Sequence, residues 1–188
     1  WNNLGNVFQA FENLNEAVDC HQKALTIQAD FAVAHYSLGN AFVDLGRLEE
    51  AVASFHEALP IEPGFAQAHR NLGGVLVSLG KLDEAVASYH DAIAIRPDYA
   101  EAHYNLGIAF QELGKLDQAI TSYHNALTTK PDYAEAHFNL GFALQALRRL
   151  DDAVASYHNA LSIKPDYAEA HNNLAVAFQD LGKPGQAV

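Results

Sequence analysis

The stretch PDYAEAHYNLG, residues 97–107, decides the fold of this chain because it recurs twice at a constant distance. It reads PDYAEAHFNLG at residues 131–141 and PDYAEAHNNLA at residues 165–175, so each copy begins 34 residues after the one before. A looser copy, QAHRNLG, lies at residues 67–73. A period of this length predicts a chain of identical supersecondary units that stack on one another.

The period accounts for the whole chain of 188 residues. The predicted repeats are 1–31 (partial), 32–65, 66–99, 100–133, 134–167 and 168–188 (partial), about five and a half repeats in total. No residues remain for a linker, so we expect a single solenoid domain over 1–188. The chain contains no Met and begins with Trp1, which favours a piece of a longer protein.

Each repeat has the pattern of two helices, which predicts an all-α fold. Apolar residues recur at steps of three and four over Ala100–Leu113 and again over Ala119–Leu127. Gly114 between them offers the positive φ that ends a helix. Pro131 ends the second helix, because the residue before a proline disfavours the helical conformation.

Acidic residues mark the predicted helix starts. Before the first helices, Asp98, Asp132 and Asp166 precede Glu101, Glu135 and Glu169 by three residues, the spacing of a capping box. Asp83, Asp117 and Asp151 open the second helices, where negative charge suits the helix dipole. Much of the acidity of the chain is therefore assigned to helix starts.

Glycine recurs inside the predicted first helices, where it costs about 1 kcal/mol relative to alanine. The positions are Gly39, Gly73, Gly107 and Gly141. We interpret them as places where two helices approach closely, with Tyr89, Tyr123 and Tyr157 fitting between. Four departures from the pattern put local geometry in doubt: Glu12 and Arg148 replace turn glycines, Pro60 lies near a helix end, and Pro184–Gly185 begins the last helix.

These features together resemble the tetratricopeptide repeat. The resemblance is carried by Trp1-x2-Leu4-Gly5-x2-Phe8 in the first repeat and by Ala51-x3-Phe55 and Pro63 in the second. The NLG phrase and the YHNAL…KPDYAEAH cadence are similar to the repeats of the O-linked N-acetylglucosamine transferase family and its bacterial relatives. The resemblance implies a right-handed superhelical solenoid of helix-turn-helix units whose first helices line a concave groove.

By that resemblance, the sixth place of each repeat faces the groove and carries a row of side-chain amides. The row holds Asn3, Ser37, Asn71, Asn105, Asn139 and Asn173. In the resembled transferase family an asparagine ladder binds the backbone of an extended peptide, and we expect the same of these asparagines. The alternative is that each asparagine bonds to a neighbouring helix and sets the geometry of the repeat.

Other groove places add apolar and amide side chains. An aromatic and apolar patch is expected from Tyr104, Ile108, Phe138 and Phe142, and further amides from Gln111 and Gln145. Such patches commonly mark interaction sites, although a neighbouring molecule or a missing domain could equally cover this one. Four amides supply only about 2–6 kcal/mol, whereas micromolar affinity needs about 8 kcal/mol. The apolar patch therefore has to supply the difference.

Several classes of function are disfavoured by the residues. A net charge of −12 argues against nucleic acid and anionic membranes as partners. Regular histidines, such as His103 and His137, lack the spacing of a zinc site, so packing is the simpler interpretation. No phosphate loop or nucleophile motif is present, so we expect neither an enzyme nor a cofactor.

We therefore predict a protein–protein interaction scaffold that binds extended peptide segments. One alternative is the substrate-targeting part of a larger enzyme, such as a glycosyltransferase. Another is a scaffold that forms homo-oligomers by end-to-end stacking, in which Ala175, Phe178 and Leu181 meet the first repeat of another molecule. The carboxylate clamp of co-chaperone repeats is excluded, because its basic residues are replaced by side chains such as Glu101 and Glu135.

Overall fold

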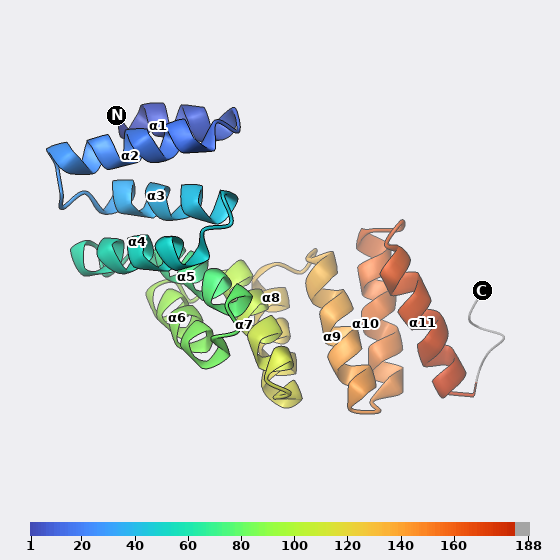
Figure 1. Cartoon of the computed structure of the whole chain (residues 1–188). Helices are drawn as coiled ribbons and strands as arrows, with labels where there is room; N and C mark the ends of the chain where they lie inside the picture. The colour runs from blue at the N-terminus through green and yellow to red at the C-terminus, as the bar shows by residue number, and fades with distance from the viewer. Residues whose placement is uncertain (183–188) are drawn as a thin grey trace. The chain divides into compact units, whose positions relative to one another are not determined.

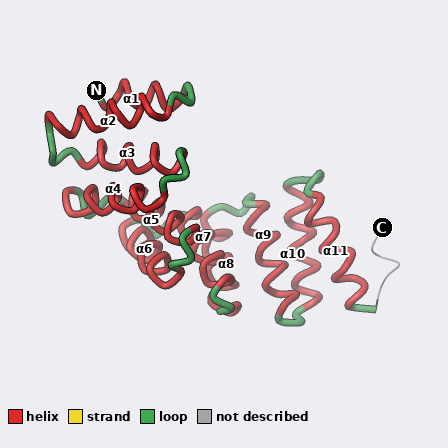
Figure 2. The backbone as a smooth tube through the Cα atoms, viewed as in Figure 1, coloured by secondary structure: helices red, strands yellow, loops and turns green. Residues whose placement is uncertain are grey.

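The computed structural model describes residues 1–182, and the helices in this part of the chain follow one another in antiparallel pairs joined by short turns (Figures 1 and 2). The first six are α1 (Asn2–Ala10), α2 (Leu14–Ile27), α3 (Ala32–Asp44), α4 (Leu48–Ile61), α5 (Ala66–Ser78) and α6 (Leu82–Ile95). They are followed by α7 (Ala100–Glu112), α8 (Leu116–Thr129), α9 (Ala134–Ala146), α10 (Leu150–Ile163) and α11 (Ala168–Asp180). The described residues contain no strand, which confirms the all-α repeat fold.

The helices fall into two compact units. The N-terminal unit, Trp1–Pro97, contains α1–α6, and the C-terminal unit, Asp98–Val188, contains α7–α11. Within each unit every helix packs against the next one in sequence, and first helices of successive repeats, such as α7 and α9, also touch. The assignment of the whole chain to one solenoid domain, with the boundaries given above, stays a prediction.

The glycines inside the first helices lie directly against buried aromatic rings. A Cβ atom added at Gly107 would lie 2.5 Å from Cε1 of Tyr123, and one at Gly141 would lie 2.7 Å from Cε1 of Tyr157. Real Cβ atoms do not approach other atoms so closely, so an alanine cannot take these places without moving the ring. The predicted close approach of the two helices of a repeat is confirmed.

In the first repeat a histidine takes the place of this buried aromatic ring. His21 has no exposed surface and lies against Gly5. Its Nδ1 forms a hydrogen bond of 2.7 Å with Oδ1 of Asn2, whereas its Nε2 is buried without a partner among the described residues. Burial lowers the pKa of His21, because the charged imidazolium loses its hydration.

The predicted capping boxes are wrong. The helix α7 begins at Ala100 with Tyr99 at the N-cap, and no side chain caps it. Asp98 therefore precedes the N-cap, and Glu101 is the second residue of the helix. The reciprocal bonds of the motif require residues at the N-cap and at the third helical position. The same displacement occurs at α9 and α11, whose N-caps are Tyr133 and Tyr167. The acidic residues predicted in the first turn of the second helices are confirmed for α6, α8 and α10.

Packing between repeats explains why an aromatic residue occupies these N-caps. The ring of Tyr133 lies 4.7 Å from the ring of Tyr104, centroid to centroid, and Tyr167 lies 5.0 Å from Phe138. In both cases the N-cap ring contacts the first helix of the preceding repeat. Burial of these rings contributes more than the roughly 1 kcal/mol that a capping side chain supplies.

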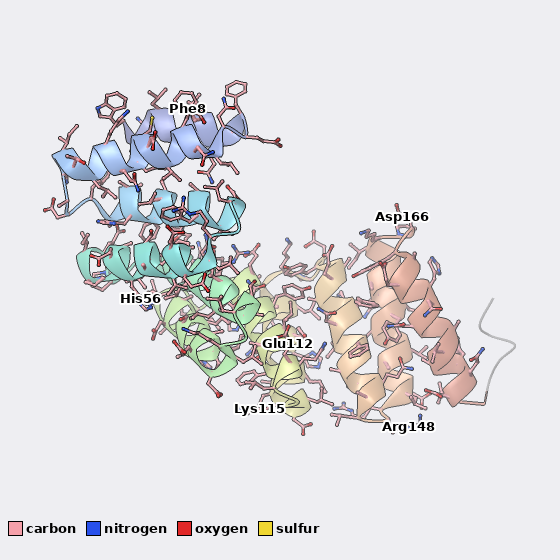
Figure 3. All side chains as sticks on the ribbon, viewed as in Figure 1. Phe8, His56, Glu112, Lys115, Arg148 and Asp166 are labelled. Atoms are coloured by element: carbon pink, nitrogen blue, oxygen red, sulfur yellow. The ribbon has the colours of Figure 1, made fainter. Side chains whose placement is uncertain are left out.

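The unusual residues at turns and helix ends leave the repeat geometry intact. Glu12 and Arg148 both adopt a φ of 60°, close to the 71° of the turn glycine Gly114 (Figure 3 shows Arg148 at the turn after α9). Pro60 lies inside α4, and α4 is as long as α6, with 14 residues. Pro60 is the second residue from the helix end, where it interrupts few backbone bonds. Pro184–Gly185 lies outside the described residues.

Candidate functional site

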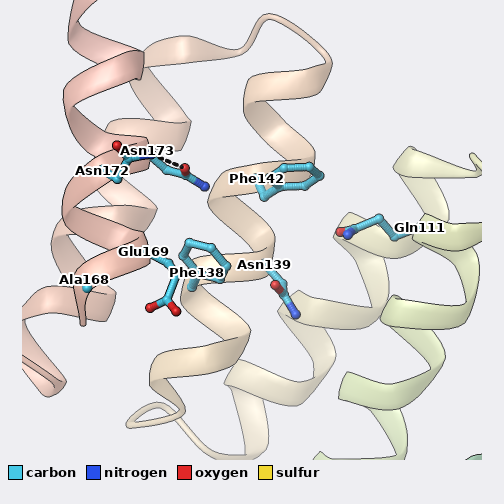
Figure 4. Close-up of a pocket in the computed structure, with 8 residues that line it drawn as sticks. All are labelled: Gln111, Phe138, Asn139, Phe142, Ala168, Glu169, Asn172 and Asn173. Carbon is cyan, nitrogen blue, oxygen red and sulfur yellow. Dashed lines mark hydrogen bonds between the residues drawn. The ribbon is translucent and has the colours of Figure 1, made fainter.

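A hollow of about 530 Å³ opens on the C-terminal unit, between the first helices of three successive repeats (Figure 4). Its lining comes from α7, α9 and α11 and consists of Gln111, Phe138, Asn139, Phe142, Ala168, Glu169, Asn172 and Asn173. Five of these residues were predicted as site residues from the sequence: Gln111, Phe138, Asn139, Phe142 and Asn173. The structure therefore brings part of the predicted amide row and part of the predicted apolar patch together.

The two phenylalanines of the hollow have different environments. Phe138 is half-buried, with its ring 5.0 Å from Tyr167 and 6.0 Å from Tyr157. Phe142, one turn further along α9, remains 45% exposed. An exposed ring of this size beside a concave surface is the kind of side chain that anchors a ligand.

Tyr104 and Ile108, predicted for the same patch, lie on α7 and do not line the hollow. The ring of Tyr104 packs 6.0 Å from Tyr123 and close to Tyr133, which leaves it half-buried. Burial is the main reason that the pKa of Tyr104 rises to about 12. Tyr104 thus belongs partly to the packing between repeats.

The asparagines of the C-terminal unit are only partly engaged within the protein. Asn139 donates from Nδ2 to Oη of Tyr104 at 3.0 Å, and this is the one hydrogen bond of its side chain among the described residues. Asn105 forms no side-chain hydrogen bond to any described residue and is half-buried. Oδ1 of Asn173 accepts a long bond of 3.5 Å from Asn172, and a bond to Asn173 also lowers the pKa of Tyr157 against the larger effect of burial.

Both predicted glutamines are held by buried tyrosines. The Oη of Tyr123 donates to Oε1 of Gln111 at 3.1 Å, and that of Tyr157 donates to Oε1 of Gln145 at 2.9 Å. The amide nitrogen of Gln145 also donates to Asp180 at 3.4 Å, so Gln145 is the more completely engaged of the two. Gln145 does not line the hollow.

In the N-terminal unit, the side-chain amide of Asn71 donates two hydrogen bonds within the protein. Its Nδ2 donates to Oη of Tyr36 at 3.1 Å and to Oδ1 of Asn40 at 2.8 Å. Its Oδ1 accepts a bond of 2.9 Å from Arg70. This is the alternative raised above, in which an asparagine sets the geometry between repeats. Asn3, also in this unit, is exposed on α1.

Three residues of the hollow were not predicted as site residues: Ala168, Glu169 and Asn172. Asn172 occupies the groove place that Tyr104 and Phe138 occupy in the preceding repeats. Glu169 was assigned to a helix cap, which the structure shows to be wrong. Its place in the repeat, four residues before Asn173 and so on the same helix face, was the signal that could have included it.

The repeated histidines contribute hydrogen bonds to the loops between repeats. The Nε2 atoms of His35, His137 and His171 each lie 2.8–3.0 Å from the backbone carbonyl six residues earlier. Among residues 1–182, no three His, Cys, Asp or Glu side chains are grouped so that they could hold a metal ion. A role in packing and loop attachment accounts for these histidines.

The predicted stacking surface at the end of the chain is only partly accessible. Phe178 is buried, whereas Ala175 and Leu181 are half-buried. Stacking of one chain on another stays a prediction. None of the helices in the described residues combines the length and the apolar character that crossing a membrane requires.

Comparison with known proteins gives the family. The model of the TPR repeat, the tetratricopeptide repeat, matches residues 5–46, 39–80, 73–114, 111–147 and 149–182. The chain belongs to the TPR family. A comparison with curated proteins gave no match.

Solved TPR structures resemble the chain over most of its length. YrrB, described as a TPR protein with an unusual peptide-binding site, is 26% identical with a TM-score of 0.78, over 91% of this chain and 88% of YrrB. MamA is 24% identical with a TM-score of 0.82, over 88% of this chain and 96% of MamA. PilF from Pseudomonas aeruginosa is 22% identical with a TM-score of 0.84, over 98% of this chain and 86% of PilF. The last two likenesses concern the fold alone.

Proposed function

We propose that this TPR protein is a non-catalytic scaffold that binds an extended peptide segment across the first helices of its C-terminal unit. The observation that carries the proposal is the hollow, in which the exposed ring of Phe142 lies beside amides that retain hydrogen-bonding capacity. An apolar surface with a few polar groups around it is the usual composition of a binding site. The description of YrrB as a protein with a peptide-binding site supports the same role.

A comparison of two equivalent asparagines supports the choice of this unit. Asn71 is surrounded by Arg70 and Asn40, which both bond to it. Two repeats later, the places of Arg70 and Asn40 hold Phe138 and Ile108. These apolar residues leave Asn139 with Oδ1 and one N–H unused, since only its bond to Tyr104 remains.

The energetics require both kinds of side chain. Each peptide hydrogen bond contributes roughly 0.5–1.5 kcal/mol net, so Asn105, Asn139 and Asn173 together supply about 1.5–4.5 kcal/mol. Burying the exposed part of Phe142 adds about 1–2 kcal/mol. Their sum, about 2.5–6.5 kcal/mol, corresponds to weak peptide recognition with a Kd between about 15 mM and 20 µM. This use of the asparagines is implied only by the resemblance of the sequence to the transferase family, and it forms part of the proposal.

A display library of random peptides of about nine residues, selected on the immobilised chain, tests the proposal. The selected peptides would be titrated by fluorescence anisotropy against the wild type and against Asn105→Ala with Asn139→Ala. We expect the double variant to lose affinity by about tenfold, the equivalent of two hydrogen bonds. Helicity measured by circular dichroism should be unchanged, because neither side chain belongs to the buried core.

The matched control is Asn125→Ala with Asn159→Ala, which removes two exposed asparagines from the second helices α8 and α10. This control should bind the selected peptides as the wild type does. The proposal is overturned if no peptide binds saturably, or if the two double variants bind equally well.

A further inference from the structure

We propose that the hollow selects peptides in which a lysine or arginine is a close neighbour of an apolar residue. This inference rests on the proposed function and names the chemistry of its ligand. It follows from the charge at the hollow, from the neighbours of that charge, and from the apolar ring beside it.

Glu169 is the only charged residue among the eight that line the hollow. The other lining side chains are apolar or neutral amides. Glu169 is exposed, and no described residue forms an ion pair with it. Glu169 and Phe138 both line the hollow, as Figure 4 shows. A ligand that enters the hollow therefore meets one unneutralised negative charge beside an aromatic surface.

Glu135 provides a second carboxylate, at the same place one repeat earlier. Its side chain is also exposed and has no ion-pair partner among the described residues. Both glutamates act on the same ring: burial is the main reason that the pKa of Tyr167 is raised, and the charges of Glu135 and Glu169 raise it further. Tyr167 packs on Phe138, so the two carboxylates border the aromatic wall of the hollow.

Two lysines of this unit, Lys130 and Lys164, lie over the rings of Tyr133 and Tyr167, and neither forms an ion pair with Glu135 or Glu169. The Nζ of Lys130 lies 4.0 Å from Oε1 of Glu101 and 4.5 Å from the ring of Tyr133. The Nζ of Lys164 lies 4.7 Å from the ring of Tyr167. Glu101 thus has Lys130 as its partner, whereas Glu135 and Glu169 have no ion-pair partner within residues 1–182. A cation of the ligand would therefore pair with these two carboxylates.

Lysine and arginine suit both features of this surface. Their alkyl stems can lie along the exposed ring of Phe142 while the cationic group reaches a carboxylate. A neighbouring apolar residue of the peptide then fills the hollow between the phenylalanines. An acidic peptide would instead be repelled, both locally and by the net charge of −12.

The test uses the same peptide selection, and it measures the amino-acid composition and the charge of the selected peptides. We expect lysine and arginine to be enriched within two positions of an enriched apolar residue, and aspartate and glutamate to be depleted. The selected peptides should bind the double variant Glu135→Gln with Glu169→Gln about tenfold more weakly than the wild type. Each lost charge pair accounts for a loss of affinity of about threefold. Their affinity should also fall as salt is raised from low to physiological concentration.

The matched control is Glu57→Gln with Asp117→Asn, which changes the net charge equally at exposed places on α4 and α8. It should bind as the wild type does, which separates local pairing from general attraction to an acidic protein. Selected peptides without enrichment of lysine or arginine, or equal binding by both charge variants, would overturn this inference and leave the proposed function standing. Absence of any saturable peptide would overturn both.

Discussion

Two adjacent glycines in α5 provide a sharp test of the close packing between helices. A Cβ atom at Gly73 would lie 2.6 Å from Cε1 of Tyr89, whereas the nearest atom to a Cβ at Gly74 is Oη of the same tyrosine, at 3.8 Å. The two places thus share a helix and a backbone conformation but differ in the space beside them. We predict that Gly73→Ala destabilises the protein and that Gly74→Ala stabilises it.

Two opposing effects set the magnitudes. Replacing a helical glycine by alanine contributes about 1 kcal/mol of stability in either position. Forcing an extra methyl group into a packed core costs about 1–3 kcal/mol. The cost at Gly73 lies at the upper end because Tyr89 is only 2% exposed and has no room to withdraw. We expect a net loss of about 1–2 kcal/mol for Gly73→Ala and a gain of about 0.5–1 kcal/mol for Gly74→Ala.

Urea unfolding followed by circular dichroism measures both variants under the same conditions. A third comparison introduces Gly73→Ala into a Tyr89→Ala background, where the clash is absent and the alanine should become stabilising. Equal unfolding midpoints for the two single variants would refute the reasoning. So would a loss at Gly73 that persists without the tyrosine ring.

Three further predictions concern other places in the chain. Arg148→Gly should stabilise the protein by up to about 1 kcal/mol in urea unfolding, because the left-handed conformation costs an L-residue about 1–2 kcal/mol and the exposed ion pair with Asp180 adds little; a loss would contradict it. His21→Phe should reduce the fall in melting temperature between pH 7 and pH 5. Burial lowers the folded-state pKa of His21 below the unfolded value of 6.5, so the neutral His21 stabilises the fold above pH 6.5 and this stabilisation is lost as pH falls. An equal fall in melting temperature for the variant and the wild type would refute this. In an alkaline titration followed by tyrosinate absorbance, Tyr104 and Tyr157 should ionise near pH 12, and stability should fall as pH rises above 10; ionisation of these two tyrosines near pH 10 would contradict it.

The period and the places of small residues predicted the fold because both are set by packing within one repeat. The ring of Tyr123 leaves no room for a Cβ atom at position 107, and both residues belong to one repeat, so a sequence pattern is enough to find the pair. The helix starts could not be found in the same way. Asp98 and Glu101 have the spacing of a capping box, but α7 begins behind Tyr99. At the equivalent place, Tyr133 contacts a ring one repeat away, a tertiary contact that overrides the local preference.

The candidate site shows the same division between local and tertiary effects. The row of asparagines is visible in the sequence, but whether an amide is available depends on residues one repeat earlier and one place away. Asn71 and Asn139 occupy the same place and donate to equivalent tyrosines. Their capacity to bind a ligand differs because Arg70 and Asn40 become Phe138 and Ile108 two repeats later.

These two replacements have two consequences. They remove the partners that would bond to the asparagine, and they place apolar surface beside the amide that is left without those partners. A ligand that pairs with Asn139 therefore also covers Phe138, so the weak hydrogen bond and the apolar burial are gained together. A TPR repeat that kept polar residues at these two places would leave no amide available. Availability of the amide and apolar character of the wall thus arise from the same two differences in sequence, and this is why the proposed peptide site is assigned to the C-terminal unit.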